Sequence, residues 1–486
     1  MTPPPRSLAG NFLALILSRV IQIASGFFVL LAAARWLSLD AYGAYASVSA
    51  MAGAAAAMTY CGIQQIMIRE MATSPGAAPT VVGQALLLRL GLVALCGLAL
   101  VVAAAFAGYG PEARLGLALA FCLEACRSLG QLACAVFQAH ERMGYEPPLA
   151  IVSGLASVAL VGAALWQGLG YTGVLAGLAL AAGLHMALAW RVVWRDLTRP
   201  SFRFSRAELW RMLGAASVVG LGVFFHQNLF RANTLVLSFL ADAATVADFQ
   251  APHEFILKLE ILPQALMLAV FPALSRLAPV DPLGARRLFR LIFRHTLHVM
   301  VLPSILLAYY AEPACVLLFG QKFQGAAMVL RLLALALAPL ALDMLVNNVL
   351  VAIGRQRYAL YYAAAALALN VAGNVYVVPR HGAVGSAVVA LCSYLWLLVF
   401  STRFAARHGY RPHALGPLVR VLCAGGACLG ACMLLRHAPF LGAAAGTLVY
   451  LAVLVGLKGF GPHDLAELRS VAKPRPQGAG RPGERP

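Results

Sequence analysis

Residues 80–108 read TVVGQALLLRLGLVALCGLALVVAAAFAG and hold one charged side chain, Arg89, in 29 positions. About 20 apolar residues in a helix cross the hydrocarbon core of a bilayer. The rest of the chain is similar, since 61% of it is hydrophobic and 11% is charged, whereas soluble domains are about 45–50% apolar and about 25% charged. The composition therefore excludes a soluble globular protein and a disordered chain, and predicts a polytopic membrane protein.

Apolar segments of similar length recur along the 486 residues, separated by Gly, Pro or charge clusters. We expect about fourteen transmembrane helices in an all-α fold, with the last two the least distinct. The first segment is expected to be a retained helix, because Arg19 interrupts it and no cleavage site follows. The fourteen segments lie at 9–34, 42–67, 80–108, 112–138, 148–168, 171–191, 209–240, 246–274, 292–318, 325–353, 357–378, 383–403, 416–435 and 439–457.

The Lys and Arg residues in the connections predict the orientation, because cytoplasmic loops carry the excess of basic residues. If the N-terminus lies inside, most of the 37 basic residues fall in inner segments, and both termini are expected in the cytoplasm. The net charge of +19 then reflects topology and does not indicate nucleic-acid binding. The outer loops hold only Arg35, Arg114, Lys322, Arg380 and Arg436.

A weak internal repeat with an offset near 212 residues predicts two lobes of six helices. Arg19 in LSRV (17–20) aligns with Arg231 in LFRA (229–232), and GYTGV (170–174) aligns with HGAVGSAV (381–388). Six helices separate the copies, so they should share one orientation and be related by an axis along the membrane normal. The expected parts are an N-lobe (1–195), a basic cytoplasmic linker (196–208), a C-lobe (209–404), two further helices (405–460) and a disordered basic tail (461–486).

Six basic residues remain inside the predicted membrane segments. A charge at the bilayer centre costs about 2.5–3.5 kcal/mol, so such residues face a cavity or pair inside the bundle. Arg suits phosphate because its guanidinium binds two oxygens and stays charged. These residues predict a cationic cavity for an anionic, amphipathic substrate. The candidate substrate-binding residues are Arg19, Arg231, Arg127, Lys258, Arg89, Arg331, Gln22, Gln227 and Asn228.

Several of these charges have a structural alternative. Arg127 follows Glu124 by three residues and Lys258 follows Glu254 by four, so each can form an ion pair on its own helix. Arg89 and Arg331 either face the cavity or extend to the headgroups. Asp343 either pairs with an arginine across helices, which we favour, or is protonated during transport. The candidate ion-coupling acids are Asp343, Glu254, Glu124 and Glu260.

The sequence offers no catalytic or metal centre. No loop is long enough for a soluble catalytic domain, and the ten cysteines mostly lie inside apolar runs, where they are expected to pack as small hydrophobic residues. The lone histidines His185 and His226 are expected to pack as well. A coupling ion, either a proton or sodium, is the only cofactor we leave open.

Several strings resemble the Wzx-type polysaccharide flippases, a branch of the multidrug/oligosaccharidyl-lipid/polysaccharide exporter superfamily. Their order and spacing along nearly the whole chain carry the resemblance. The strings are AARWLSLDAYGAYA (33–46), GIQQIMIREMA (62–72), AVFPALSRL (269–277), FGQKFQGAAMVLRLLALALAPL (319–340), VLVAIGRQRYAL (349–360) and VPRHGAVGSAV (378–388).

The resemblance implies a function in O-antigen, capsule or exopolysaccharide pathways. A flippase of this kind carries an undecaprenyl-diphosphate-linked oligosaccharide across the bacterial inner membrane by alternating access. The implied partners are this lipid-linked substrate, membrane lipids and a polysaccharide polymerase or chain-length machinery. Three alternatives stay open at this point: a lipid II-type flippase, a cation-coupled drug antiporter of the same superfamily, and an integral-membrane polymerase or ligase.

Overall fold

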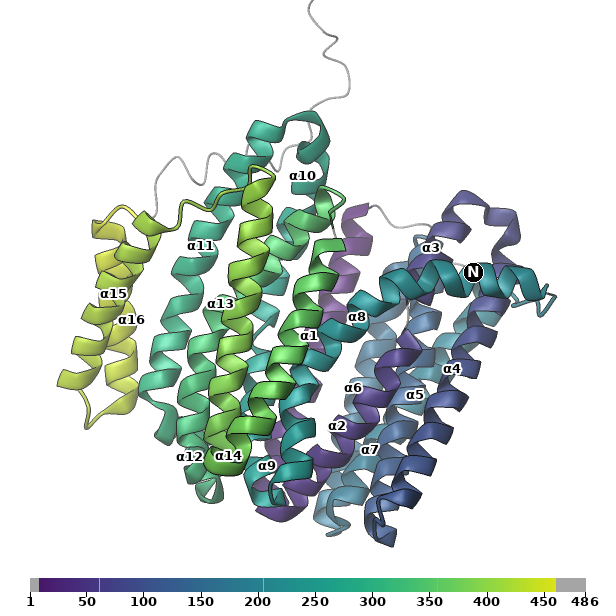
Figure 1. Ribbon diagram of the computed structural model, residues 1–486, viewed down its shortest axis with the longest axis horizontal. Helices are drawn as coiled ribbons and strands as arrows, with labels where there is room; N and C mark the ends of the chain where they lie inside the picture. The colour runs from purple at the N-terminus through teal and green to yellow at the C-terminus, as the bar shows by residue number, and fades with distance from the viewer. Residues whose placement is uncertain (1–7, 61, 204, 356, 460–486) are drawn as a thin grey trace, which may run out of the picture. The chain divides into compact units, whose positions relative to one another are not determined.

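The computed structural model describes residues 8–60, 62–203, 205–355 and 357–459, and throughout these residues the regular structure is helical (Figure 1). The predicted tail at 461–486 lies outside them. The short helices are η1 (Pro75–Ala77), η2 (Met143–Tyr145), η3 (Val193–Leu197) and η4 (Gln321–Ala326). The long ones are α1 (Leu8–Trp36), α2 (Leu39–Tyr60), α3 (Ile63–Thr73), α4 (Ala78–Phe106), α5 (Pro111–Ala139), α6 (Glu146–Trp166), α7 (Gly170–Val192), α8 (Arg206–Leu240), α9 (Ala243–Lys258), α10 (Ile261–Val280), α11 (Pro282–Tyr309), α12 (Ala311–Phe319), α13 (Ala327–Ala352), α14 (Arg357–Arg407), α15 (Leu415–Leu434) and α16 (Pro439–Gly456).

The expected all-α, polytopic fold is confirmed. Within the described residues, 11 helices are long and apolar enough to cross a membrane, and the helix pair bent by 48° within α8 makes 12. The sequence predicts about fourteen spans, and α14 and the α9–α10 segment account for the difference.

Helix α14 is too long for one crossing of the bilayer. Its 51 residues would extend over about 75 Å, against a hydrocarbon core of about 30 Å. Gly382 interrupts it with φ 51° and ψ −135°, a conformation that only glycine adopts readily. The two predicted spans at 357–378 and 383–403 are the parts of α14 on either side of this break.

The predicted span at 246–274 is not one continuous helix. It is divided into α9 and α10, which are separated by Leu259 and Glu260. Pro263 explains the break, because a proline ring clashes with the carbonyl four residues earlier and has no N–H to bond it. The carbonyl that Pro263 excludes belongs to Leu259.

Glycines with positive φ recur at the repeat offset. Gly108 and Gly320 have φ of 68° and 96°, and Gly170 and Gly382 have φ of 63° and 51°. The members of each pair lie 212 residues apart, which is the offset that aligns Arg19 with Arg231. Each glycine ends a helix or begins the next at an inter-helix turn, so the turn chemistry agrees with the repeat.

Contacts divide the chain into two compact units, and each is described by itself. Unit 1 comprises Met1–Ile261, Tyr310–Ala336 and Arg357–Leu397, and unit 2 comprises Leu262–Tyr309, Leu337–Gln356 and Leu398–Pro486. The predicted boundaries of the lobes, linker and C-terminal helices stay a prediction. Unit 1 contains a hydrophobic core in which Met67, Val82, Leu132 and Phe137 are fully buried.

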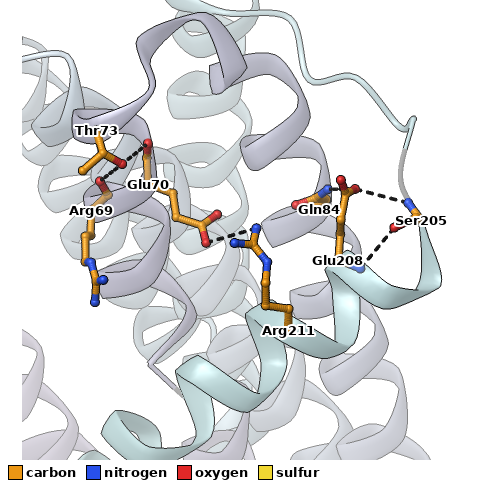
Figure 2. A network of polar contacts seen from close by, with 7 residues as sticks. All are labelled: Arg69, Glu70, Thr73, Gln84, Ser205, Glu208 and Arg211. Carbon is orange, nitrogen blue, oxygen red and sulfur yellow. Dashed lines mark hydrogen bonds and ion pairs between the residues drawn. The ribbon is translucent and has the colours of Figure 1, made fainter.

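Polar contacts fasten the start of α8 to α3 and α4 within unit 1, as Figure 2 shows. Ser205 and Glu208 form a capping box, in which each side chain bonds the other's backbone N–H and satisfies the helix end. The Glu208 carboxylate also accepts a hydrogen bond of 2.9 Å from Gln84. Arg211 lies 3.5 Å from Glu70 on α3. The beginning of α8 is therefore fixed at its cap and along its first turns.

A buried amide network joins α8 to α14 inside unit 1. The side-chain oxygen of Asn233, Oδ1, accepts hydrogen bonds of 3.2 Å from the Asn370 amide and 2.9 Å from the Asn374 amide. The Asn370 amide also donates to the Ser393 hydroxyl at 2.9 Å. Buried polar groups are costly unless bonded, so these side chains specify which faces of the two helices meet.

We predict that Gly382→Ala destabilises the protein by about 1 kcal/mol, because an L side chain is strained at positive φ. Gly430→Ala is the matched control, since a Cβ there meets nothing within 4 Å inside the regular helix α15. Thermal unfolding of the purified protein in detergent measures both. Equal melting temperatures for the two variants would contradict the turn at Gly382.

Candidate functional site

A cavity of about 660 Å³ lies within unit 1. It is lined by residues from α1, α2, α3, α5, α6, α7, α8 and α9. Its polar lining is unusual for a membrane interior, where each exposed polar group needs a partner or water. A polar surface of this kind indicates a binding space for a hydrophilic group.

The structure brings together nine of the thirteen predicted site residues around this cavity. These nine come from four helices and the turn after α9, and their functional roles stay predictions. They are Arg19, Gln22, Glu124, Arg127, Gln227, Arg231, Glu254, Lys258 and Glu260.

Glu124 on α5 is the centre of a charge cluster. Its carboxylate lies 2.9 Å from Arg127, one turn along the same helix, and 3.9 Å from Arg231 on α8. Arg231 also donates a hydrogen bond of 2.9 Å to the carbonyl of Gly53 on α2. The Glu124–Arg127 pair is the one predicted from helical spacing. The contact with Arg231 joins two helices, so spacing within one helix could not reveal it.

Gly53 lets the Arg231 guanidinium approach the α2 backbone. A Cβ at this position would lie 2.6 Å from Nε of Arg231, which is well inside van der Waals contact. The small residue therefore makes room for the charged group. Arg231 therefore has a backbone partner on α2 and an acidic partner on α5, although no acidic residue lies at helical spacing from it on α8.

The other two cavity cations have different surroundings. Lys258 lies 3.4 Å from Glu254, which is the predicted pair on α9. Arg19 on α1 donates a hydrogen bond of 3.5 Å to Gln22 on its own helix. No ion pair within 4.0 Å joins Arg19 to an acidic side chain in the described residues. Arg19 is therefore the cavity cation with the weakest compensation.

The cavity lining is mixed in sign, and the expected cationic cavity is not confirmed. Four acidic side chains line it beside four basic ones. The physical reason is the cost of an uncompensated charge away from water, which an opposite charge reduces. Most of the cavity charge is therefore neutralised when no ligand is present. The acidic members are Glu124, Glu146, Glu254 and Glu260, and the basic members are Arg19, Arg127, Arg231 and Lys258.

Glutamines are the part of the site that the sequence analysis mostly missed. Six of them line the cavity, and each amide both donates and accepts hydrogen bonds, as sugar hydroxyl groups do. Only two were among the predicted site residues. Their unusual density at membrane depth was the signal that could have found the rest. The six are Gln22, Gln64, Gln131, Gln138, Gln227 and Gln250.

Two histidines, His185 and His253, line the cavity, whereas the sequence drew attention to His185 and His226. His185 lines the cavity, with Nε2 3.7 Å from the Cys134 thiol. His253, which the sequence analysis did not select, also lines it, and its Nε2 lies 2.8 Å from the Tyr394 hydroxyl. Within the described residues, no three His, Cys, Asp or Glu side chains are placed to hold a metal ion together.

Arg89 neither lines the cavity nor extends to the headgroups. It is fully buried and donates a hydrogen bond of 2.9 Å to Ser128 on α5. Its guanidinium lies 5.6 Å from the ring centroid of Tyr60, close enough for a cation–π interaction. Arg89 is therefore placed inside the bundle beside a hydroxyl and an aromatic ring, and its role in substrate binding stays a prediction.

Three other predicted residues also lie away from the cavity lining. Asn228 donates to the carbonyl of Phe224 on its own helix at 3.0 Å, which satisfies it locally. Arg331 is exposed on α13, and its Nη1 lies 3.9 Å from the Met328 sulfur on the same helix.

Asp343 is buried on α13 in unit 2, and Asn347 donates to it at 3.4 Å. No basic side chain in the described residues forms an ion pair with Asp343. The described residues therefore hold no arginine paired with Asp343. Its hydrogen-bond donor is the Asn347 side-chain amide, one turn further along α13.

Residues 8–278 match the polysaccharide biosynthesis protein family, and residues 249–447 match the lipid II flippase MurJ family. No curated protein of known function matches the chain in sequence.

Solved structures share the fold at low sequence identity. The lipid II flippase MurJ in an inward closed conformation has a TM-score of 0.74 and 13% identity, covering 94% of this chain and 99% of that one. The MATE transporter VcmN of Vibrio cholerae has a TM-score of 0.57 and 16% identity, and the match covers 82% of this chain and 96% of VcmN. A MOP superfamily transporter from Pyrococcus furiosus has a TM-score of 0.56 and 15% sequence identity, and the match covers 82% of this chain and 95% of the transporter. These similarities establish a MurJ- and MATE-like fold.

We predict that Glu124→Gln lowers the melting temperature of the protein, because it leaves two guanidiniums without their shared carboxylate. Adding Arg127→Gln should restore part of the loss, with a coupling of about 0.5–3 kcal/mol. Glu112→Gln is the matched control, since it removes the same charge from an exposed position at the start of α5. Additive effects of Glu124→Gln and Arg127→Gln would show that the pair contributes no stability.

Proposed function

Because the chain belongs to the polysaccharide biosynthesis protein family, we propose that it is a flippase for a lipid-linked oligosaccharide. The observation that carries the proposal is the polar cavity within unit 1, where four basic side chains and six glutamines meet. A volume of about 660 Å³ falls in the range of sites for small molecules. It suits a diphosphate and its first sugar more closely than a whole glycan.

The proposed substrate is an oligosaccharide on undecaprenyl diphosphate, carried from the cytoplasmic to the periplasmic leaflet of the bacterial inner membrane. Arginines bind the diphosphate through paired N–H groups. Glutamine amides bind the sugar hydroxyl groups. The lipid tail stays in the bilayer, because the cavity is polar. Such a cycle moves its substrate without changing a covalent bond, so the protein acts as a transporter.

The charge cluster suggests how the electrostatic free energy of the cavity can stay similar with and without a bound ligand. Without ligand, Glu124 compensates Arg127 and Arg231. A bound diphosphate takes the place of the Glu124 carboxylate as their partner, and Arg19 adds a cation that forms no ion pair within the described residues. On release, Glu124 returns. The cavity therefore never holds two arginines without an anionic partner.

Glu124 and Glu254 are also the better candidates for ion coupling. Both line the cavity beside cations that a phosphate would contact, whereas Asp343 lies in unit 2. Transport into vesicles under a proton gradient or a sodium gradient, applied separately, distinguishes the coupling ion.

A lipid II flippase is the second candidate function. It is favoured by the MurJ family match over residues 249–447 and by the TM-score of 0.74 with the MurJ structure. Both substrates carry a lipid diphosphate, so they differ in the attached glycan. In reconstituted vesicles we expect faster flipping of an undecaprenyl-diphosphate oligosaccharide than of lipid II. The opposite order would select the second candidate, and export of cationic dyes alone would instead indicate a drug antiporter.

We predict that the double substitution Arg19→Gln/Arg231→Gln reduces flipping in vesicles at least about tenfold, as expected for each lost charged contact to phosphate. Arg114→Gln, at an exposed position near the start of α5, is the control for charge loss. Comparable amounts of folded protein, measured by gel filtration, must accompany the loss. Full complementation of a flippase-null strain by the double variant would refute the proposed phosphate site.

A further inference from the structure

A second cavity, of about 290 Å³, lies within unit 2. It is formed by the first turns of α11 and by the connection between α14 and α15. Four of its lining residues are arginines and none is acidic. The lining consists of Leu283, Arg286, Arg287, Arg290, Gly409, Arg411 and His413.

These arginines differ from Arg127, Arg231 and Lys258 of unit 1, each of which lies within 4.0 Å of a glutamate. In the described part of the chain, no ion pair includes Arg286, Arg287, Arg290 or Arg411. Asp281, just before α11, forms a local contact instead: its carboxylate accepts a hydrogen bond of 2.9 Å from the backbone N–H of Gly284. Four like charges around one small space repel one another, and a bound anion would relieve that repulsion.

The connection between α14 and α15 is shaped around one of these guanidiniums. Gly409 has φ 88°, and a Cβ there would lie 2.5 Å from the guanidinium carbon of Arg286. The next residue, Tyr410, is buried, and its ring packs at 78° to that of Phe289 on α11. Burial raises the pKa of the Tyr410 hydroxyl, and the nearby Arg286 charge opposes the rise. The pocket wall is thus a packed structure.

The position of the pocket indicates a ligand at the membrane surface. α11 and α15 are both candidate membrane spans, and the pocket lies at the start of one and just before the other. Leu283 on the pocket wall is 64% exposed, and Leu415 at the start of α15 is 78% exposed. A basic pocket flanked by exposed apolar side chains matches an anionic lipid, whose phosphate and acyl chains need both surfaces.

We propose that this pocket binds the phosphate of an anionic phospholipid headgroup. Arg287, Arg290 and Arg411 supply planar donors suited to phosphate oxygens, and the N-terminus of α11 adds the positive end of its dipole. Basic residues at membrane surfaces commonly set only topology. The shared cavity and the missing acidic partners distinguish these arginines from that general role.

Lipid binding to the purified full-length protein, measured by native mass spectrometry, tests the proposal. We expect the wild type to retain phosphatidylglycerol in preference to phosphatidylcholine. The variant Arg287→Gln/Arg290→Gln/Arg411→Gln should lose at least about tenfold in phosphatidylglycerol affinity, since each arginine near an anionic surface contributes several-fold. This variant spares Arg286, which packs against Gly409. The single variants Arg290→Gln and Arg411→Gln serve if the triple variant fails to fold.

Arg276→Gln/Arg403→Gln/Arg420→Gln is the matched control, because it removes three charges from the same unit outside the pocket. The control should keep the wild-type affinity, and excess inorganic phosphate should leave the lipid bound. Equal losses in the two triple variants would overturn the proposal in favour of a diffuse surface charge. Complete displacement by inorganic phosphate, or no preference for phosphatidylglycerol, would overturn it as well.

Discussion

The cost of placing an ionised side chain in hydrocarbon governs the arrangement of this protein. Each such charge costs about 2.5–3.5 kcal/mol at the bilayer centre unless something compensates it. Arg127 and Arg231 are compensated by Glu124, and Lys258 by Glu254. Arg89 is compensated differently, by the Ser128 hydroxyl and the Tyr60 ring. The charged residues therefore determine which helix faces meet and where a cavity remains.

The same constraint shapes the proposed transport cycle. A cavity of unpaired arginines would bind a diphosphate tightly, but the empty protein would be unstable and release would be slow. Glu124, shared by two arginines, stabilises the empty cavity by pairing with both. In the proposed cycle it also speeds release, because it competes with the ligand for the same N–H donors. In the proposed cycle, the weakly compensated Arg19 would give the cavity its preference for anions. A mixed lining is thus better suited to a carrier, which must release its substrate, than a purely cationic one.

Much of the fold follows from sequence patterns that have a direct physical cause. The apolar runs predict the helices, and the spacing of Glu124 with Arg127 and of Glu254 with Lys258 predicts both pairs on single helices. Pro263 could also have predicted the break between α9 and α10, because its effect on the preceding turn is local. The Ser205–Glu208 spacing likewise carries the signature of a capping box.

Contacts between helices were beyond such reasoning. The rotation of a helix about its axis depends on packing, so one sequence cannot tell whether Arg89 meets Ser128 or a cavity. For the same reason, the sequence could not place Arg231 beside Gly53 and Glu124, or turn Asn228 toward its own backbone. The cavity glutamines were missed because uncharged amides stand out less than arginines in an apolar run, although an amide at membrane depth also needs hydrogen-bond partners.

The most direct test of this account is a structure of the protein with a lipid-linked diphosphate bound. The account predicts the diphosphate in the cavity of unit 1, with its oxygens within hydrogen-bond distance of Arg127 and Arg231 and the Glu124 carboxylate moved away from both. A diphosphate bound elsewhere, or bound in this cavity while Glu124 keeps its contacts with the two arginines, would contradict it.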